Sequence, residues 1–366
     1  MKNGSRLAAL GGVVVAGALA LSACGSDDNS GSSASEAPKG NIDCAKGTVN
    51  AAGSSAQKNA IEEWTKLFAA KCAGANLNYN PAGSGAGIQS FTSGQVSFAG
   101  SDSALKPAEV TAAQKRCQGA PALNLPMVVG PIGVVYNVDG ADSLKLSPET
   151  VAGIFAGKIK TWDDPAITKE NAGVKLSGQI KPIFRADESG TTENFTKYLK
   201  ATAPGAWTWE PAKKWPNGVG QGATKSDGVS AQVKSTKGSI SYVELSFATN
   251  NGLKTADIKN GAGEYTKLSP DTASKAVAGA KVVGTGDDVA LKIDYTTKEP
   301  GAYPIVLVTY EIACQKGLPA DQAKFVKSFL TYTSSADGQK ILTNLGYAPL
   351  PDSVLTKVQA SVKGLS

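Results

Sequence analysis

The amino-acid sequence predicts an α/β fold built as two lobes. Short apolar segments alternate with segments of helical periodicity, a pattern typical of sheets covered by helices. The chain has 366 residues, which is long enough for two hydrophobic cores. Two long apolar segments, Leu125–Asn137 and Tyr303–Tyr310, suggest strands that cross between the lobes. We expect a ligand to bind in a cleft between these lobes.

Local patterns predict the individual elements. The segment Asn59–Cys72 places Ile61 and Trp64 on one face of a helix. Serine followed by proline at 147–148 and at 269–270 predicts two further helix starts. Two more helices are predicted, at Phe325–Thr333 and Ser335–Leu345. The predicted strands are Thr48–Ala51, Leu77–Tyr79, Val96–Ala99, Val128–Asn137, Ile180–Arg185, Ser239–Val243 and Tyr303–Tyr310.

The composition excludes several classes of function. The sequence has no histidine, so it has no Ser-His-Asp or Cys-His catalytic site and no histidine-based metal site. The motifs of nucleotide-binding loops, zinc proteases and CxxC sites are absent as well. The net charge is a mild +6 and the basic residues are scattered, which argues against nucleic-acid binding. We therefore expect a binding protein without metal or cofactor, and not an enzyme.

The N-terminus has the pattern of an export signal. A positively charged start precedes the apolar run Ala8–Ala23, which is short for a membrane span but suits a signal peptide. This run ends in LSAC, which resembles the bacterial lipobox and implies cleavage after residues 1–23 and lipid attachment to Cys24. The alternative is plain secretion in which Cys24 is incidental. Residues 24–43 are rich in serine and glycine and are predicted to form a flexible tether.

The other four cysteines are expected to form two disulfides, because their number is even and the protein is exported. Three pairings are possible from the sequence alone. Cys72 and Cys117 each end a predicted helix and lie near each other in the sequence. We therefore favour Cys72–Cys117, which leaves Cys44–Cys314 to join the two ends of the folded chain.

Three places in the chain have the composition of an anion-binding helix start. Residues 53–55, 83–87 and 189–192 are rich in Gly, Ser and Thr, and each lies between a predicted strand and a predicted helix. The first N–H groups of a helix lack partners within the helix and carry the positive end of its dipole. A phosphate or carboxylate group fits such a place. Serine is also the commonest helix N-cap, so a single such start could be capping alone.

Three charged residues near these helix starts indicate which kind of anion would bind. Arg185 precedes the third helix start, and its guanidinium group matches a tetrahedral oxyanion, while Asp187 could hold the guanidinium in place. Asp102 follows another predicted strand, where a carboxylate would repel an anion unless that anion carries a proton. Hydrogen phosphate carries one and sulfate does not. The alternatives are a surface ion pair for Arg185 and Asp187, and a helix cap for Asp102.

At these residues the chain resembles the PstS family, the phosphate-binding lipoproteins of bacterial phosphate ABC transporters. The matching segments, in order, are GSSAQKNAIEEW, GSGAGIQSF, FAGSDSAL, RADESGTTENF and YAPLPDSV. The resemblance covers residues 49–366 and, with the tether and the cysteines, is closest to actinobacterial members. It implies a two-lobed periplasmic-binding-protein fold of type II that closes on one phosphate. The phosphate contacts it implies are Ser55, Ala56, Ser84, Asp102, Arg185, Ser189, Gly190 and Thr191, with Asp187 supporting Arg185.

The first of these loops departs from the family pattern. Ser55, Ala56 and Gln57 stand where Thr-Phe-Pro is common, which puts the affinity in doubt more than the ligand. A further loop, residues 220–228, resembles a segment of the family, but a packing turn is the better interpretation.

The resemblance also implies a complete transport role. One lobe would comprise residues 44–126 and 303–366, and the other residues 127–302. The protein would be a monomer held by its lipid at the outer face of the cell membrane, and it would deliver inorganic phosphate to the permease subunits of the transporter. The alternatives are a binding protein for sulfate, molybdate or tungstate, a secreted phosphatase with Ser55 or Ser189 as nucleophile, and an adhesin that retains only the fold.

Overall fold

The computed structural model describes residues 42–366. The predicted signal peptide, Cys24 and all but the last two residues of the predicted tether lie outside this part of the chain, so lipid attachment stays a prediction. Within residues 42–366, no helix is both long and apolar enough to cross a membrane.

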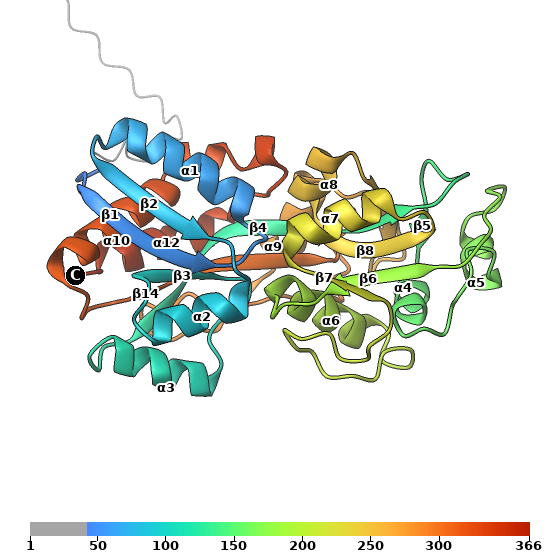
Figure 1. The fold of residues 1–366 in the computed structure, drawn as a ribbon, viewed down its shortest axis with the longest axis horizontal. Coiled ribbons are helices and arrows are strands. Elements are labelled where there is room, and N and C mark those ends of the chain that lie inside the picture. Colours follow the sequence, from blue (N-terminus) through green and yellow to red (C-terminus); the bar gives the residue numbers. More distant parts are fainter. Residues whose placement is uncertain (1–41) are drawn as a thin grey trace, which may run out of the picture. The chain divides into compact units, whose positions relative to one another are not determined.

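A nine-stranded sheet runs through the described unit (Figure 1). Its strand order is β2-β1-β3-β14-β4-β8-β6-β7, and β9 pairs with β4. Helices pack on this sheet, so the α/β class predicted from the alternating pattern is confirmed. The strands of this sheet are β1 (Gly47–Gly53), β2 (Ala75–Asn80), β3 (Phe98–Ser101), β4 (Ala122–Asn137), β6 (Lys181–Arg185), β7 (Gln221–Ala223), β8 (Ser239–Glu244), β9 (Lys254–Thr255) and β14 (Val306–Cys314).

The remaining elements surround this sheet. The short strands are β5 (Lys145–Leu146), β10 (Asp257–Lys259), β11 (Tyr265–Thr266), β12 (Lys281–Val282) and β13 (Leu291–Lys292). The helices are α1 (Lys58–Lys71), α2 (Ser84–Thr92), α3 (Pro107–Arg116), α4 (Pro148–Phe155), α5 (Pro165–Glu170), α6 (Gly190–Thr202), α7 (Lys225–Ser235), α8 (Leu245–Asn251), α9 (Pro270–Ala278), α10 (Ala320–Thr333), α11 (Ala336–Lys340), η1 (Thr343–Leu345, a 3₁₀-helix) and α12 (Asp352–Lys363).

The long strands β4 and β14 connect the two halves of the sheet. They pair antiparallel from Pro131 opposite Val306 to Ala122 opposite Cys314, and β4 then continues beside β8. Both strands are buried over almost their whole length, which explains their nearly continuous apolar sequence. In Figure 1 they lie between the helices around α1 and those around α6.

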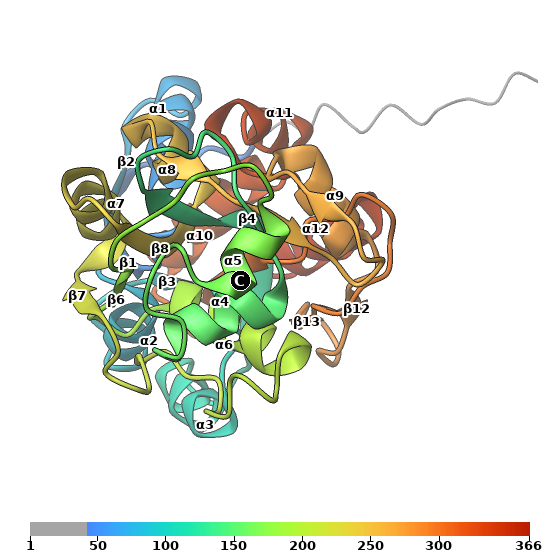
Figure 2. The ribbon, with the colours of Figure 1, turned by 90° about the vertical axis from the view of Figure 1, so that its right-hand side faces the viewer.

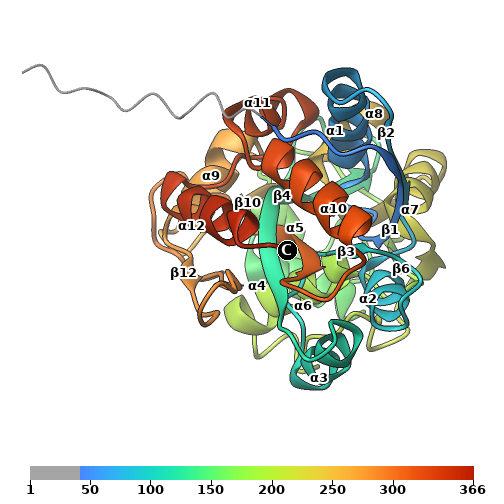
Figure 3. The ribbon, with the colours of Figure 1, turned by 90° about the vertical axis from the view of Figure 1, so that its left-hand side faces the viewer.

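Two large hydrophobic clusters flank these strands. The first cluster includes Trp64 of α1, Phe329 of α10 and Val358 of α12, and Figure 3 shows α10 and α12 side by side. The second cluster includes Phe155 of α4 and Phe195 of α6, and Figure 2 views the protein from the end at which α4 lies. Residues of β4 and β14 belong to both clusters. The lobe boundaries given by residues 44–126, 127–302 and 303–366 stay a prediction.

The disulfide pairing inferred from the sequence is wrong. The structure pairs Cys44 with Cys72 and Cys117 with Cys314, at Cα–Cα distances of 5.2 and 5.3 Å. The register of the sheet explains both bonds. Cys44 and Cys72 lie just before β1 and β2, whose first residues pair in parallel, and Cys117 lies shortly before Ala122, the partner of Cys314. Proximity in the sequence was therefore the wrong guide, since strand pairing brings these cysteines together.

The two disulfides are expected to stabilise the fold unequally. They close loops with sequence separations of 28 and 197 residues, and the entropy that a cross-link removes from the unfolded chain grows with loop length. Replacing Cys117 and Cys314 by alanine should lower the free energy of unfolding by roughly 5 kcal/mol, against roughly 3.5 kcal/mol for Cys44 and Cys72. Urea unfolding of the two double variants tests this, and a larger loss from the shorter loop would contradict it.

Candidate functional site

The site begins where two parallel strands end. β1 and β3 pair in parallel with Gly53 opposite Gly100, so Ser54 and Asp102 leave the sheet at the same edge. The contact is close: a Cβ on Gly53, whose φ is +145°, would lie 2.0 Å from the carbonyl oxygen of Gly100. A Cβ on Gly87 of α2 would lie 2.4 Å from the Cα of Gly53. Glycine is required at 53 because the backbone of β3 lies against it, and at 87 because α2 packs directly on the end of β1.

Asp102 is the centre of a group of hydroxyls. Its side chain is buried, and its Oδ1 accepts hydrogen bonds from Ser54 Oγ at 2.5 Å and Thr309 Oγ1 at 2.7 Å. Its Oδ2 accepts one from Ser84 Oγ at 3.1 Å. Burial raises the pKa of Asp102 to about 6, against the opposing effect of these hydroxyls, so the group is mostly ionised at pH 7. A carboxylate has about four acceptor positions, so one remains for a ligand.

The start of α6 lies directly against this group. The Gly190 N–H donates to Ser84 Oγ at 3.2 Å, and Asn194 Nδ2 donates to the carbonyl oxygen of Asp102 at 2.6 Å. A Cβ on Gly190 would lie 2.5 Å from the Cβ of Asp102, so only glycine permits this approach. Ser189 caps the helix by accepting from the N–H of Thr192 at 3.3 Å. Its hydroxyl thus has the capping role that was the alternative to anion binding.

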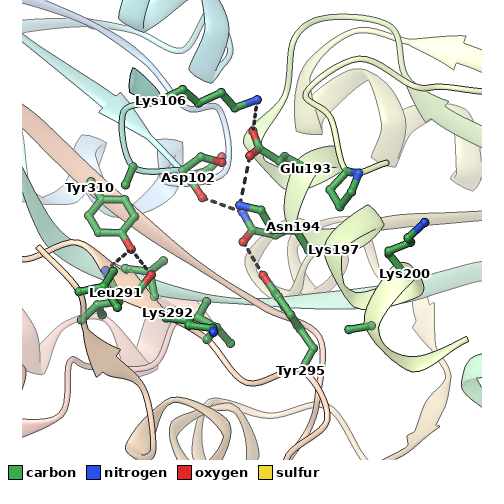
Figure 4. A pocket seen from close by; sticks show the side chains of 17 residues that line it. Asp102, Lys106, Glu193, Asn194, Lys197, Lys200, Leu291, Lys292, Tyr295 and Tyr310 are labelled. Atoms are coloured by element: carbon green, nitrogen blue, oxygen red, sulfur yellow. Dashed lines mark hydrogen bonds and ion pairs between the residues drawn. The ribbon is translucent and has the colours of Figure 1, made fainter. Parts of the chain in front are cut away.

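A cavity of about 560 Å³ is lined by Asp102, Glu193, Asn194 and Tyr295, among other residues. Figure 4 shows Asn194 between Asp102 and Tyr295, and the Tyr295 hydroxyl donates to Asn194 Oδ1 at 2.6 Å. Glu193 is nearly buried on the same helix. Burial alone would raise the pKa of Glu193, but Lys197, Lys213 and Lys106 hold it below its usual value.

Arg185, the last residue of β6, is the buried cation of the site. Its Nε donates to Asp187 Oδ1 at 2.8 Å, and its Nη2 donates to the other oxygen of the same carboxylate. Its Nη1 faces Thr191 Oγ1 at 3.5 Å and Ser226 Oγ at 3.3 Å. Burial alone would lower the pKa of Arg185, but Asp187 raises it overall, so the guanidinium stays charged. The predicted supporting contact between Asp187 and Arg185 is thus present.

The structure adds a fourth helix start, in the loop 220–228 that was predicted to be a packing turn. Ser226 lies in the first turn of α7, and its N–H donates to Ser55 Oγ at 3.2 Å. Its hydroxyl lies 3.1 Å from that of Ser55 and also accepts from Arg185. Lys225 has a φ of +61°, and its N–H donates to Asp187 Oδ1 at 2.8 Å. The same Ser/Thr/Gly composition that marked the other three starts was present here, at 224–228.

The predicted contact residues all lie in one connected region. A continuous set of hydrogen bonds runs from Ser55 through Ser226 and Arg185 to Thr191, and a second one joins Gly190, Ser84 and Asp102. The first loop differs from the expectation, because α1 begins only at Lys58 and the Ala56 N–H already donates to Ser54 Oγ at 3.0 Å. All the predicted contact residues are buried or lie in buried turns of the backbone: Ser55, Ala56, Ser84, Asp102, Arg185, Ser189, Gly190 and Thr191.

Two buried acids near this region were not found from the sequence. Glu244 ends β8 and accepts a hydrogen bond from Thr191, and Glu311 lies on β14 opposite Gly100. Both have no exposed surface. They lie in apolar strand sequences, where no neighbouring motif marks them as part of a site. Within residues 42–366 there is no cluster of acidic or cysteine side chains suited to hold a metal ion.

Comparison with known proteins identifies the class. The family described as PBP superfamily domain matches residues 39–337. Phosphate-binding protein PstS 3 of Mycobacterium tuberculosis is 44% identical over 369 residues, which cover 99% of each chain. Phosphate-binding protein PstS of Pasteurella multocida is 34% identical over 327 residues, covering 86% of this chain and 90% of that protein. The solved structure of the periplasmic phosphate-binding protein PfluDING with bound phosphate has a TM-score of 0.71 at 24% identity, over 86% of this chain and 93% of that one.

The fold and the matching profile thus define a member of the PBP superfamily, with the type II fold that was predicted. More narrowly, the chain belongs to the PstS family of phosphate-binding proteins, which confirms the resemblance seen in its sequence motifs.

Proposed function

We propose that this protein binds inorganic phosphate at the outer face of the cell membrane and delivers it to the permease of a phosphate ABC transporter. The observation that carries the proposal is the pairing of opposite chemistries in one buried place. Arg185 and the helix starts supply hydrogen-bond donors for an oxyanion, while Asp102 supplies a carboxylate that accepts a hydrogen bond from an O–H group. An anion that carries both negative oxygens and an O–H group satisfies both sides.

The phosphate would be held by Ser55, Ala56, Ser84, Asp102, Arg185, Ser189, Gly190 and Thr191, and we add Ser226 to this set. Ser226 is included because its N–H and hydroxyl lie between Ser55 and Arg185. Several of these side chains form hydrogen bonds with one another in the structure, as Ser55 does with Ser226 and Ser84 with Asp102. The ligand would replace these hydrogen bonds. Because the ligand replaces these hydrogen bonds, the site favours an anion that gives every donor and acceptor a new partner. A buried polar group left without a partner costs about 1–3 kcal/mol.

Ligand-driven closure follows from the predicted lobes. Ser55, Ser84 and Asp102 belong to the lobe of residues 44–126 and 303–366, and Arg185 with the start of α6 belongs to residues 127–302. A phosphate that contacts both lobes would stabilise their closed arrangement, which the permease would then recognise. Cleavage of residues 1–23 and lipid attachment at Cys24 would keep the protein, as a monomer on the tether of residues 24–43, beside that permease.

A phosphatase remains the main alternative from another class, and the surroundings of its candidate nucleophiles argue against it. Ser55 lies beside another serine and a backbone N–H, and Ser189 caps a helix. Neither hydroxyl contacts a general base in the described part of the chain. The relatives compared above are named as binding proteins. Release of phosphate from a chromogenic phosphate ester would support the phosphatase instead.

The test is a calorimetric titration of the ligand-free protein with phosphate and with sulfate. We expect tight binding of phosphate and none of sulfate by the wild type. Asp102→Asn should weaken phosphate or admit sulfate, because its amide can donate to an unprotonated oxygen. Equal binding of both anions by the wild type would refute the role of Asp102, and binding of neither would refute the proposed function.

A further inference from the structure

The cavity of about 560 Å³ beside Asn194 is not used by the proposed phosphate site. Of the residues proposed to contact phosphate, only Asp102 lines this cavity. The carboxylate of Asp102 already accepts hydrogen bonds from Ser54, Ser84 and Thr309. A cavity of this size holds an organic molecule, and a single tetrahedral ion would leave most of it empty. We therefore ask which ligand its lining would accept.

Much of this lining is apolar. Leu291 lies on β13, Ile293 follows that strand, and Val308 lies on β14. Val283, which follows β12, also lines the cavity and is 56% exposed. Within residues 42–366 the only other large apolar side chain that is exposed is that of Val110. A ligand with an apolar body would cover Val283 and its neighbours and remove them from water.

The charges that line the cavity are mostly positive, with four lysines against two acids, Asp102 and Glu193 (Figure 4). Lys292, the second residue of β13, interacts with Asp294 at longer range but forms no ion pair within residues 42–366. An acid group on a ligand would give Lys292 a partner. The other three lysines already form ion pairs with glutamates: Lys106 and Lys197 with Glu193, and Lys200 with Glu210.

Two buried polar atoms at the cavity lack hydrogen-bond partners among residues 42–366. They are Ser103 Oγ and Glu193 Oε2, and each of these residues is 4% exposed and lines the cavity. Lys106 and Lys213 approach Glu193 Oε2 only to 3.7 and 3.9 Å, which is too far for a hydrogen bond. Buried polar atoms normally have partners, so an N–H or O–H group on a ligand would supply the one that is missing here.

We propose that this cavity is a binding site for an amphipathic organic anion. Its apolar body would cover Leu291, Ile293 and Val283, its acid group would pair with Lys292, and an N–H or O–H group would reach Glu193. A cationic ligand is excluded by the excess of lysines, and inorganic phosphate would leave the apolar lining exposed to water. The proposal does not rest on phosphate binding, since it uses none of the donors assigned to that site.

A pair of fluorescent dyes tests the proposal. Anilinonaphthalene sulfonate combines apolar rings, a sulfonate and one N–H group, and its fluorescence rises in apolar surroundings. The protein should bind it saturably, with about one dye per chain. Phenylnaphthylamine has the same rings and N–H group without the sulfonate, and it should bind about tenfold more weakly because it gains nothing from the lysines. Equal affinity for the two dyes, or no saturable binding of the sulfonate, would overturn the proposal.

Two surface variants locate the bound dye. Val283→Asp and Lys292→Glu each place a negative charge at the cavity, so each should weaken binding of the sulfonate about fivefold or more. Val110→Asp and Lys160→Glu make the same changes at exposed positions that do not line the cavity, and they should bind within about twofold of the wild type. Urea unfolding confirms that all four variants fold. Equal affinity in all four, or an equal loss in the controls, would overturn the proposal, because the dye would then bind elsewhere.

Discussion

Arg185→Met is expected to reduce phosphate affinity by roughly 30-fold or more and to destabilise the fold. Arg185 is 2% exposed and makes a two-point ion pair with Asp187, so methionine leaves a partly buried carboxylate, 18% exposed, without its charged partner. Removing one member of such a pair costs about 2–5 kcal/mol, and about 1.4 kcal/mol corresponds to a factor of ten in binding. Calorimetric titration with phosphate measures the affinity, and urea unfolding measures the stability.

Lys58→Met provides a matched control for this experiment. Lys58 pairs with Asp227 at 3.0 Å, but the two side chains are 27% and 52% exposed. Exposed pairs contribute about 0–1 kcal/mol, so this variant should bind phosphate within tenfold of the wild type. If Arg185→Met also bound phosphate within tenfold of the wild type, Arg185 would not be the main cation of the site.

Glu311→Gln is expected to make the protein more stable at pH 8 and to flatten the dependence of its stability on pH. Glu311 has no exposed surface, and neither of its carboxyl oxygens has a hydrogen-bond partner within residues 42–366. Its pKa is raised to about 8, chiefly by burial and to a smaller extent by the charge of Asp102, against the lowering effect of the Gln57 amide. Gln57 Oε1 is also buried without a partner, so a neutral side chain that can donate suits position 311.

The sign of the effect follows from the two pKa values. In the unfolded chain Glu311 ionises near its ordinary value of 4.5, and in the folded protein it ionises near 8. Between these values the unfolded chain binds fewer protons, so the free energy of unfolding falls as the pH rises from about 4.5 to about 8 and changes little above that. One pKa unit corresponds to about 1.4 kcal/mol, which sets an upper limit of roughly 5 kcal/mol for this loss.

Urea unfolding of the wild type and Glu311→Gln at pH 5 and pH 8 measures this difference. The wild type should lose several kcal/mol more than the variant between the two pH values. Glu62→Gln, on the exposed face of α1, changes the same charge at the surface and should follow the wild-type curve. Parallel pH dependence of the wild type and Glu311→Gln would show that Glu311 is not held neutral by its burial.

The sequence predicted the class of fold and most of its elements because their signals are local. The segment Ser239–Val243 differs from β8 by one residue, and Asn59–Cys72 from α1 by one residue at each end. The segment Ser335–Leu345 was wrongly predicted as one helix. It forms α11 and a 3₁₀-helix, with Gln339 turned inward to bond the carbonyl oxygens of Met127 and Thr333. The contact with Met127 joins residues 212 positions apart, and such a contact leaves no local pattern in the sequence.

The site was predictable only where a motif marked it. Gly, Ser and Thr next to helix starts led to Ser84, Arg185 and Gly190, which the structure brings together. Thr309 has no such mark. It contacts Asp102 because β14 lies antiparallel beside β3, a pairing between residues more than 200 positions apart. Glu244 could not be predicted either, because its strand has the sequence of an ordinary buried strand. The disulfide pairing could not be predicted because it depends on strand register.

The first hydrophobic cluster contains residues from both ends of the described chain. During synthesis, it must therefore assemble after the second cluster. The first cluster combines Trp64 and Phe68 with Phe329, Val358 and Val362, so it cannot close until almost the whole chain has been made. The second cluster needs nothing beyond Leu307 and can assemble earlier. Apolar side chains such as Trp64 therefore stay uncovered while the 329 − 64 = 265 residues up to Phe329 are added. This N-terminal segment is the part that most needs protection from aggregation.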